Sequence, residues 1–249
     1  MNIGIGISTF NRPNALKVCL ESIQEHIPGH DVYVSDDGSE PDNWQNAINI
    51  CDTHGAIMDQ EPNENQGVAA NENRLLRMLD SYDYIMMLMD DALVISPQLI
   101  QAHITAINQT GINIFACPHE GDRGGIKDHI GLVMIQNSTS GPMIFMTAQV
   151  ISTIGGYDSR MRRMHWDDID FMNRAIRAGF GSKWSGNNVL PGTPSLENID
   201  DLIQNQGVTD CVPMDTKQEW ASENRSVFNI SVSECDEGNF YREYREVEG

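Results

Sequence analysis

Apolar residues along the chain fall into two patterns: short continuous runs, and longer stretches in which they recur every third or fourth residue. The continuous runs predict buried strands, and the periodic stretches predict amphipathic helices that bury one side. In the first half the expected strands are 3–8, 31–35, 56–58 and 85–94, and the expected helices are 13–23, 44–51 and 68–79. This alternation predicts an α/β fold with a mostly parallel central sheet and helices on both faces.

The second half continues with similar elements but weaker periodicity. Helices are expected at 98–107, 148–154, 167–178 and 198–206, and strands at 112–117, 130–135, 141–146 and 180–184. The polar, Gly-rich stretch 118–128 predicts a loop. From about residue 207 the chain is polar and acidic, and we expect an irregular tail that packs only partly or folds over the site. The chain shows no internal repeat or linker, which predicts a single domain followed by this tail.

The apolar run from Ile85 to Val94 contains two adjacent carboxylates, Asp90 and Asp91, at which the strand is expected to stop. Carboxylates at the carboxyl end of a buried strand lie where open α/β sheets bind their ligands. Because the two charges repel each other, a divalent cation that carries a phosphate would stabilise them. Asp is also common in turns, so this run alone leaves a metal–diphosphate site and a plain strand-end turn equally open.

Three further polar clusters follow predicted strands or begin a predicted helix. They are residues 8–12 after the first strand, 36–39 after the second, and 65–73 at the start of the third helix. In a doubly wound sheet these positions meet at one crevice. Each cluster alone is ordinary turn chemistry, but together with Asp90 and Asp91 they favour one shared ligand site.

In this order the clusters resemble glycosyltransferase family 2, whose members have the GT-A fold. The sequence Ile-Ser-Thr-Phe-Asn-Arg-Pro at 7–13 is similar to the family's first strand and loop, and Val-Ser-Asp-Asp-Gly-Ser at 34–39 is similar to its nucleotide-binding turn. Residues 65–73 resemble its Asn-x-Gly segment. Met-Asp-Asp-Ala at 89–92 lies where the family carries an Asp-x-Asp metal motif.

The acceptor half of the family is similar to the segments 155–158, 166–171 and 177–180, so the resemblance covers residues 3–184. It implies a single GT-A domain at 1–190, with an acidic C-terminal extension at 191–249. Within the domain, residues 1–97 would form the nucleotide-sugar-binding half and residues 98–190 the acceptor and catalytic half.

The resemblance also implies how a nucleotide-sugar donor would be held. Asp37 would accept a hydrogen bond from the base, and Asp90 would face the ribose or the diphosphate. Asp91, together with Asp90, would approach a divalent metal, either Mn²⁺ or Mg²⁺. The full donor-binding set is Ser8, Thr9, Asn11, Arg12, Asp37, Asn73 and Asp90.

Two positions depart from the family pattern. Ala92 replaces the last Asp of the metal motif, so the metal site lacks one expected ligand. Glu72 stands where many members place an Arg near the nucleotide. The metal is therefore expected to rest on Asp90 and Asp91.

Asp167 and Asp168 follow Trp166 at the predicted start of a helix, near the positive end of its dipole. That position favours an ionised carboxylate, whereas burial and the adjacent charge raise a pKa and make a better base. By resemblance, Asp168 is the catalytic base and Asp167 orients the acceptor. Helix capping is the alternative role for this pair. His165 and Trp166 are candidate acceptor contacts, for which packing is an equally good explanation.

The implied reaction is inverting transfer of a sugar, in one displacement, from a UDP-sugar to the hydroxyl of a carbohydrate or another acceptor. Asp168 would take the proton, and the metal would stabilise the departing diphosphate. One alternative is a nucleotidyltransferase on a related sheet, which needs a basic residue such as Arg12 in the first loop to hold a triphosphate. The other is a degenerate nucleotide-sugar-binding module without catalysis.

Charge and composition narrow the class of partner. The chain has 36 acidic and 16 basic residues and a formal net charge of −20, which argues against capture of nucleic acid or of an anionic membrane. Nucleic acid is therefore a disfavoured acceptor. Five scattered Cys without a CxxC pair, a first strand that starts at once, and the lack of a long apolar run predict a soluble cytoplasmic protein without a transmembrane helix.

Overall fold

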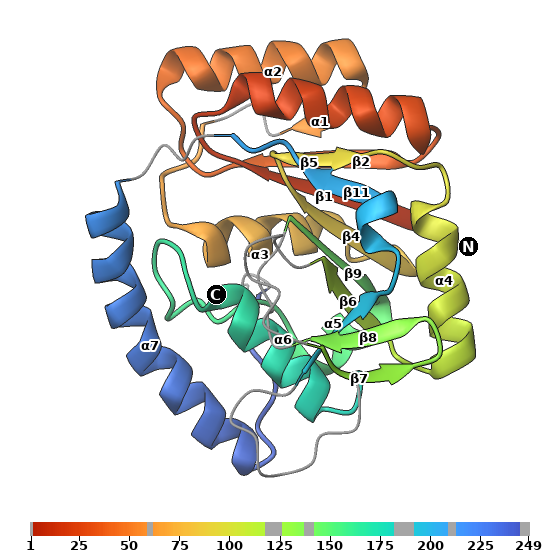
Figure 1. Ribbon diagram of the computed structural model, residues 1–249. Coiled ribbons are helices and arrows are strands. Elements are labelled where there is room, and N and C mark those ends of the chain that lie inside the picture. Colours follow the sequence, from red (N-terminus) through yellow and green to blue (C-terminus); the bar gives the residue numbers. More distant parts are fainter. Residues whose placement is uncertain are drawn as a thin grey trace.

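The computed structural model describes residues 2–58, 62–117, 126–136, 142–181, 192–208 and 213–244. At its centre is a six-stranded sheet with the order β3-β2-β1-β4-β9-β6 (Figure 1). The first four of these strands run parallel, and β9 is antiparallel to both β4 and β6. The predicted α/β fold with a mostly parallel sheet is confirmed. In sheet order the strands are β3 (Ile57–Met58), β2 (Asp31–Asp36), β1 (Ile3–Thr9), β4 (Tyr84–Met89), β9 (Met143–Thr147) and β6 (Ile114–Cys117).

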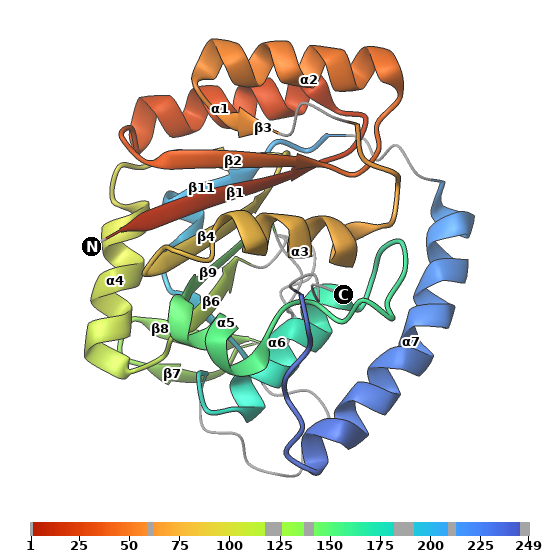
Figure 2. The same cartoon turned by 180° about the vertical axis from the view of Figure 1, so that it is seen from behind.

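Helices cover both faces of this sheet, and each face has its own apolar core (Figures 1 and 2). Three helices contribute to the first core: α1 (Pro13–His26), α2 (Pro41–His54) and α4 (Leu99–Thr110). Four others contribute to the second core: α3 (Val68–Met78), α5 (Ala148–Ile154), α6 (Asp167–Arg177) and, through Phe228, α7 (Met214–Asp236).

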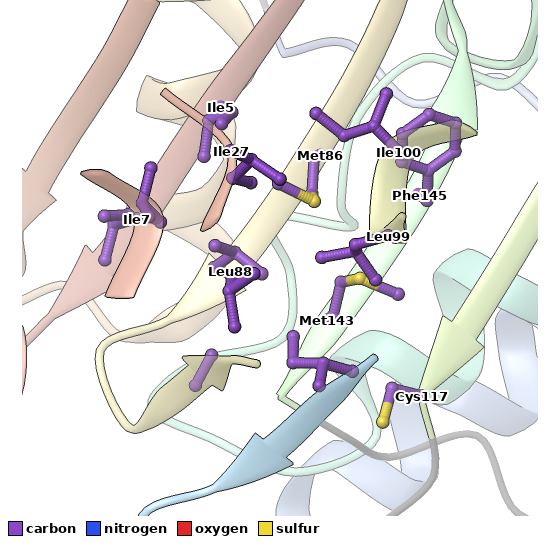
Figure 3. Packing of buried hydrophobic residues seen from close by; sticks show 14 of the residues in the cluster. Ile5, Ile7, Ile27, Met86, Leu88, Leu99, Ile100, Cys117, Met143 and Phe145 are labelled. Atoms are coloured by element: carbon purple, nitrogen blue, oxygen red, sulfur yellow. The ribbon is translucent and has the colours of Figure 1, made fainter. Parts of the chain in front are cut away.

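Strand β4 belongs to both cores. Met86 and Leu88 lie in the first core, which Figure 3 shows from close by together with Phe145 of β9. Ile85 and Met87 are buried in the second core. The prediction of a central strand covered on both faces is therefore confirmed.

Strand β1 alternates isoleucine with glycine because its two faces have different neighbours. Its isoleucines fill the first core, whereas Gly4 and Gly6 face the end of α3. A Cβ atom added at Gly4 would lie 2.5 Å from Leu79 Cδ2, and one at Gly6 would lie 2.9 Å from Leu79 Cδ1. Glycine at both positions therefore lets this helix pack closely against β1.

The apolar run 85–94 forms two strands. Strand β4 ends at Met89, and Asp90 and Asp91 form the turn that follows. The chain continues as β5 (Ala92–Val94), which pairs with β11 (Ile203–Asn205) in a separate two-stranded sheet. The two carboxylates thus lie at the carboxyl end of β4, where the strand was expected to stop.

Residues 126–136 form a hairpin instead of the single strand that the sequence predicted after a loop. Its strands are β7 (Ile126–Ile130) and β8 (Val133–Gln136), and β10 (Thr193–Leu196) completes a three-stranded sheet. The turn contains Gly131 at φ 62°, a conformation that glycine adopts without strain. The apolar residues on either side concealed this turn in the sequence.

Two other predicted elements differ from the structure. The helix expected at 198–206 is a short 3₁₀ helix, η2 (Ile199–Asp201), followed by β11. In the strand expected at 180–184, Phe180 and Gly181 are not in strand conformation, and 182–184 lie outside the described residues. Residues 118–125 of the predicted loop also lie outside them.

The prediction of an irregular tail was wrong, because residues 214–236 form the helix α7 (Met214–Asp236), which packs along α6 (Figure 2). Its buried positions lie three, four or seven residues apart, on one face, but are chemically mixed, so the apolar periodicity of an amphipathic helix is faint. They include Lys217, Asn224, Phe228, Ser231 and Cys235. In the part of the chain that the structure describes, no helix is long and apolar enough to cross a membrane.

A fully buried arginine ties the segment after α7 to the rest of the domain. Arg174 of α6 lies 2.7 Å from Asp170 through Nε and Oδ2, and both side chains have no exposed surface. Its other nitrogens donate to the carbonyl oxygens of Ile154, Gly156 and Phe240. This side chain therefore joins α6, the end of α5 and the C-terminal segment.

We predict that Arg174→Met lowers the free energy of unfolding by about 3–5 kcal/mol, because it leaves the Asp170 carboxylate buried without its cation. Urea unfolding followed by circular dichroism measures this change. Adding Asp170→Leu to that variant should recover part of the loss. The matched control is Lys17→Met, which removes an ion pair to Glu21 that is about half exposed and should cost less than about 0.5 kcal/mol. Equal losses in the two single variants would contradict the prediction.

Candidate active site

Residues from the ends of β1, β2 and β4 surround a pocket with an empty volume of ≈ 680 Å³. The first turn of α3, the loop before α6 and helix α7 also contribute to it. Four residues that the sequence predicted as donor contacts line it: Ser8, Thr9, Arg12 and Asp37. We name it the donor pocket after that prediction. Its apolar lining consists of Phe10, Val68, Met89, Met164 and Trp220. A mostly apolar pocket with a few fixed polar groups is typical of a small-molecule site.

Asp37 follows β2 and is held firmly at the edge of the donor pocket. The backbone nitrogen of Gln66 donates to its Oδ1 at 3.1 Å, and that of Gly67 donates to its Oδ2 at 3.0 Å. Arg74 Nη2 lies 3.2 Å from Asp37 Oδ1. Burial raises the pKa of Asp37, while the backbone donors and Arg74 oppose this rise.

Arg74 is a site residue that the sequence analysis missed. By the resemblance, many family members were expected to place an arginine at position 72, but it is Arg74, two residues further along α3, that reaches Asp37. Arg74 also donates to the Asp36 carbonyl oxygen at 3.3 Å and to Asn71 Oδ1 at 2.9 Å. It is the only basic residue between positions 63 and 76, so the need of Asp37 for a cation was the signal that could have identified it.

Asn71, which the sequence analysis also missed, joins α3 to the ends of β1 and β2. Its Nδ2 donates to Ser8 Oγ at 2.7 Å and to the Ser35 carbonyl oxygen at 3.0 Å. Its Oδ1 accepts from Ser35 Oγ at 2.6 Å. The position of Ser8 in the donor pocket is therefore set by buried hydrogen bonds.

The side chains of two predicted donor contacts, Asn73 and Asn11, are engaged in the framework of the site. Asn73 donates to the Tyr157 carbonyl oxygen at 3.0 Å and accepts from the Tyr157 nitrogen at 2.8 Å. Asn11 Oδ1 accepts from the Glu40 nitrogen at 2.8 Å and from Asn43 Nδ2 at 3.1 Å. Neither is among the residues that line the donor pocket.

Arg12 binds both carboxylates of the turn after β4. Its Nη2 lies 2.5 Å from Asp90 Oδ1, and its Nη1 lies 3.2 Å from Asp91 Oδ2. Thr9 Oγ1 donates to Asp90 Oδ2 at 2.7 Å. Burial raises the pKa of Asp90 to about 7, and Arg12 and Thr9 oppose this rise.

The residues at this turn fit a divalent ion. Asp90 Oδ1 is buried without a hydrogen bond of good geometry, and the Asp91 carboxylate remains 15% exposed. Carboxylate oxygens are the ligands that Mg²⁺ and Mn²⁺ prefer. Ala92, at the third position of the motif, is fully buried in the first apolar core. An ion bound here would therefore share the two aspartates with Arg12.

Asp167 and Asp168 begin α6, as the sequence predicted. Asp168 is half-buried and lines a small cavity with an empty volume of ≈ 210 Å³, together with Glu72 and Tyr157. Met89 lines both this cavity and the donor pocket, so the two are adjacent. Burial raises the pKa of Asp167 to about 6, and burial together with the neighbouring charges of Asp167 and Glu72 raises that of Asp168.

Glu72 lines the same small cavity as Asp168 and does not line the donor pocket. Its side chain is 4% exposed, and among the described residues its Oε2 has no hydrogen-bond partner. Burial, and then the charge of Asp167, raise the pKa of Glu72 to about 8. Glu72, Asp167 and Asp168 thus form an acidic cluster that retains at least one proton near neutral pH.

His165 and Trp166 precede the acidic pair and have positive φ angles of 75° and 69°. The Trp166 ring packs against Phe228 of α7, with 4.9 Å between ring centroids. The Arg225 guanidinium lies 5.7 Å from the centre of the Trp166 ring. Trp166 therefore has a clear packing role, and an acceptor contact by either residue stays a prediction.

This arrangement agrees with a known protein family. The model of the family described as glycosyl transferase family 2 matches residues 5–165. The chain belongs to this family. The match includes the donor-pocket residues of β1, β2, α3 and β4 and ends just before Asp167. No curated protein was found whose sequence matches the chain.

Solved glycosyltransferase structures share the fold of this family 2 chain. Mannosyltransferase PcManGT from Pyrobaculum calidifontis, in complex with GDP-Man and Mn²⁺, is 13% identical with a TM-score of 0.61, over 93% of this chain and 62% of that one. S. aureus TarS 1-349 in complex with UDP-GlcNAc is 11% identical with a TM-score of 0.59, and the match covers 93% of this chain and 66% of that one. GalNAc-T7 with UDP, GalNAc and Mn²⁺ is 9% identical with a TM-score of 0.58, and the match covers 79% of this chain and 42% of that one. These similarities confirm the GT-A fold, and this chain spans less than two thirds of the length of each.

The raised pKa of Glu72 predicts how the stability of this family 2 chain depends on pH. The ordinary pKa is 4.5 and the folded one is about 8, so between these values the unfolded chain has lost a proton that the folded chain keeps. Stability therefore falls as pH rises through this window. Glu72→Gln removes the effect, and the stability of the variant relative to the wild type should increase with pH by at most about 1.4 kcal/mol per unit.

Urea unfolding at a series of pH values between 5 and 8 measures this difference. Glu21→Gln, at an exposed position of α1, is the control and should show no such trend. If the difference in stability between Glu72→Gln and the wild type does not change with pH, the pKa of Glu72 is not raised in the folded protein and the prediction is wrong.

Proposed function

We propose that this chain is an inverting glycosyltransferase that moves a sugar from a UDP-sugar donor to the hydroxyl group of an acceptor. The observation that carries this proposal is the shared boundary at Met89, with the donor pocket on one side and the cavity of Asp168 on the other. A donor whose nucleoside fills the pocket would have its sugar next to the acidic pair. UDP as the nucleotide is supported by the similar structures of TarS and GalNAc-T7, and PcManGT contains GDP-Man.

The nucleoside would be held mainly by Asp37 and the apolar lining of the pocket. Asp37 would accept a hydrogen bond from the N–H group of the uracil base. Arg74 orients that carboxylate from the side of α3 and opposes the rise in its pKa that burial causes. Ser8 and Thr9 supply hydroxyl groups at the edge of β1, and Phe10 supplies an apolar surface.

The diphosphate would lie near the turn after β4. Arg12 and Thr9 orient Asp90, and the partly exposed Asp91 carboxylate is the group that a divalent ion would reach. When bound, such an ion would stabilise the negative charge on the departing nucleoside diphosphate.

Asp168 would accept the proton of the acceptor hydroxyl. The hydroxyl oxygen forms a bond to the anomeric carbon, the bond from that carbon to the diphosphate oxygen breaks, and UDP leaves from the opposite face with inversion. A proton held by Glu72 removes one negative charge from the acidic cluster. Together with the helix N-terminus and the hydrogen bond from the acceptor, this favours an ionised Asp168. Asp167 would orient the acceptor.

The nucleotidyltransferase alternative has less support. It needs a basic residue in the first loop to hold a triphosphate, and Arg12 is bound to both Asp90 and Asp91. A binding module without catalysis differs from the proposed transferase in turnover, which the next experiment measures.

We predict that Asp168→Asn lowers the rate of UDP release from a UDP-sugar by about 10²–10⁴-fold, since it removes the general base. The dissociation constant of UDP should change less than threefold, because Asp168 lies outside the donor pocket. Coupled UDP detection and calorimetry measure these two quantities. Undiminished release in Asp168→Asn would eliminate the base assignment, and tight UDP binding by a wild-type protein that shows no turnover with any acceptor would favour the binding module.

We predict that UDP raises the Tm of the wild type more strongly with Mn²⁺ than with EDTA, since a ligand that binds only the folded state stabilises it. Asp91→Asn should lose this metal-dependent part, because it removes the exposed carboxylate of the turn. Differential scanning fluorimetry at a fixed UDP concentration makes the measurement. If the shift of the wild type is the same with Mn²⁺ and with EDTA, the proposed metal site is wrong.

A further inference from the structure

The loop that precedes the catalytic pair has a strained backbone. Among the described residues, positive φ angles outside glycine occur at Asn11, Arg163, His165 and Trp166, and three of these four positions lie directly before Asp167. Residues other than glycine rarely adopt this conformation, and they keep it only where the surrounding structure holds them. The contacts that hold residues 162–166, here called the catalytic loop, therefore help to set the position of Asp167 and Asp168.

One buried side chain of α7 supplies four of these contacts. Asn224 is 3% exposed, and its Oδ1 accepts from the Arg162 nitrogen at 3.1 Å. Its Nδ2 lies 2.8 Å from the Arg162 carbonyl oxygen, 3.1 Å from that of Met164 and 3.0 Å from that of His165, and donates to them. This amide thus holds the catalytic loop through its backbone, whatever the side chains of the loop are.

The other side of the catalytic loop is bound to the donor half. The Val68 nitrogen at the start of α3 donates to the Arg163 carbonyl oxygen at 2.5 Å, and Arg163 Nη1 donates to Asn65 Oδ1 at 2.6 Å. Gly67 runs beside Arg163 at φ 96°, and a Cβ atom there would lie 2.2 Å from the Arg163 nitrogen. The loop is therefore held between the N-terminus of α3 and helix α7.

The same face of α7 also reaches the donor pocket. Trp220 lies one turn before Asn224 and lines the pocket, with the Arg163 guanidinium 5.7 Å from the centre of its ring. Phe228 lies one turn after Asn224 and packs against Trp166. All three residues are outside the part of the chain that matches the family model, which ends at residue 165.

We propose that helix α7 is a working part of the active site. Asn224 is a positioning residue that holds the catalytic loop, and through it Asp168, while Trp220 forms the wall that closes the donor pocket beside the nucleoside. This inference rests on the proposed function, because it takes Asp168 as the base and the pocket as the donor site. The two residues lie one turn apart but have different roles: Asn224 affects the chemical step, and Trp220 affects the binding of the nucleoside.

The test compares Asn224→Ala and Trp220→Ala with Asn229→Ala, which makes the same substitution as the first at an exposed position of α7. Calorimetry with UDP gives Kd, and UDP release from a UDP-sugar gives kcat and the donor KM. We expect Asn224→Ala to lower kcat by about 10–100-fold, as misplacement of a catalytic group does. Because Arg163 and Met164 of the catalytic loop also line the pocket, the Kd of UDP should rise as well, but less than in Trp220→Ala. Trp220→Ala should raise Kd and KM about tenfold or more, as loss of an aromatic contact to a base does, with kcat within threefold. Asn229→Ala should match the wild type.

Asn224→Asp keeps the acceptor for the Arg162 nitrogen but loses the donors to the three carbonyl groups. This variant replaces Asn224→Ala in the assays if the alanine variant does not fold. It should also lower kcat by a larger factor than it raises the Kd of UDP. If kcat and the Kd of UDP keep their wild-type values in the Asn224 variants, or in Trp220→Ala, the inference is overturned while the proposed function stands. If the Asn224 variants and Trp220→Ala lose kcat and UDP affinity to the same extent, helix α7 has a purely structural role. If the wild type neither binds UDP nor releases it from any UDP-sugar, the proposed function itself fails.

Discussion

Burial of strand β4 on both faces is the constraint on which the position of the site depends. Because its side chains fill two opposite apolar cores, a polar residue within the strand would be buried without a partner. The carboxylates are therefore confined to the turn at its end. Asp90 is still fully buried there, and it is stable because Arg12 and Thr9, from the end of β1, bind it. The same contacts join two neighbouring strands at the edge where the donor pocket begins.

Much of the first half of the fold could be predicted from the sequence, because its strands are continuous apolar runs and its helices have clear apolar faces. The directions in which individual side chains point could not be predicted from the sequence. Positions 72 and 74 of α3 are about 200° apart around the helix, so Arg74 reaches Asp37 while Glu72 lies with Asp168. Only the orientation of the packed helix decides which of them takes which neighbour. Helix α7 escaped prediction because Asn224 and its other buried polar residues satisfy hydrogen bonds instead of adding apolar surface.

The acidic residues of the site have two kinds of environment. Asp37, Asp90 and Asp170 are each bound by an arginine, whose planar, permanently charged group suits carboxylates well. In the acidic cluster the neighbours are other carboxylates, and burial together with their charges raises the pKa values of Glu72 and Asp168. In the first kind of environment the arginines oppose the rise in pKa that burial causes at Asp37 and Asp90, whereas in the second the neighbouring carboxylates add to it. The two kinds occur within one domain whose net charge is −20.

The contacts of the segment after α7 have a consequence for the order in which the protein folds. Arg77 of α3 donates to the Tyr244 carbonyl oxygen, and Tyr244 Oη donates to Asp80, across sequence separations of 167 and 164 residues. During synthesis these contacts can form only after nearly the whole described chain has left the ribosome. The parallel strands of the donor half can pair earlier, whereas the catalytic loop acquires its final conformation among the last elements. Trp220 of α7 also lines the donor pocket, so the pocket and the catalytic loop are both completed late, after the strands that precede Asp37 and Asp90 have paired.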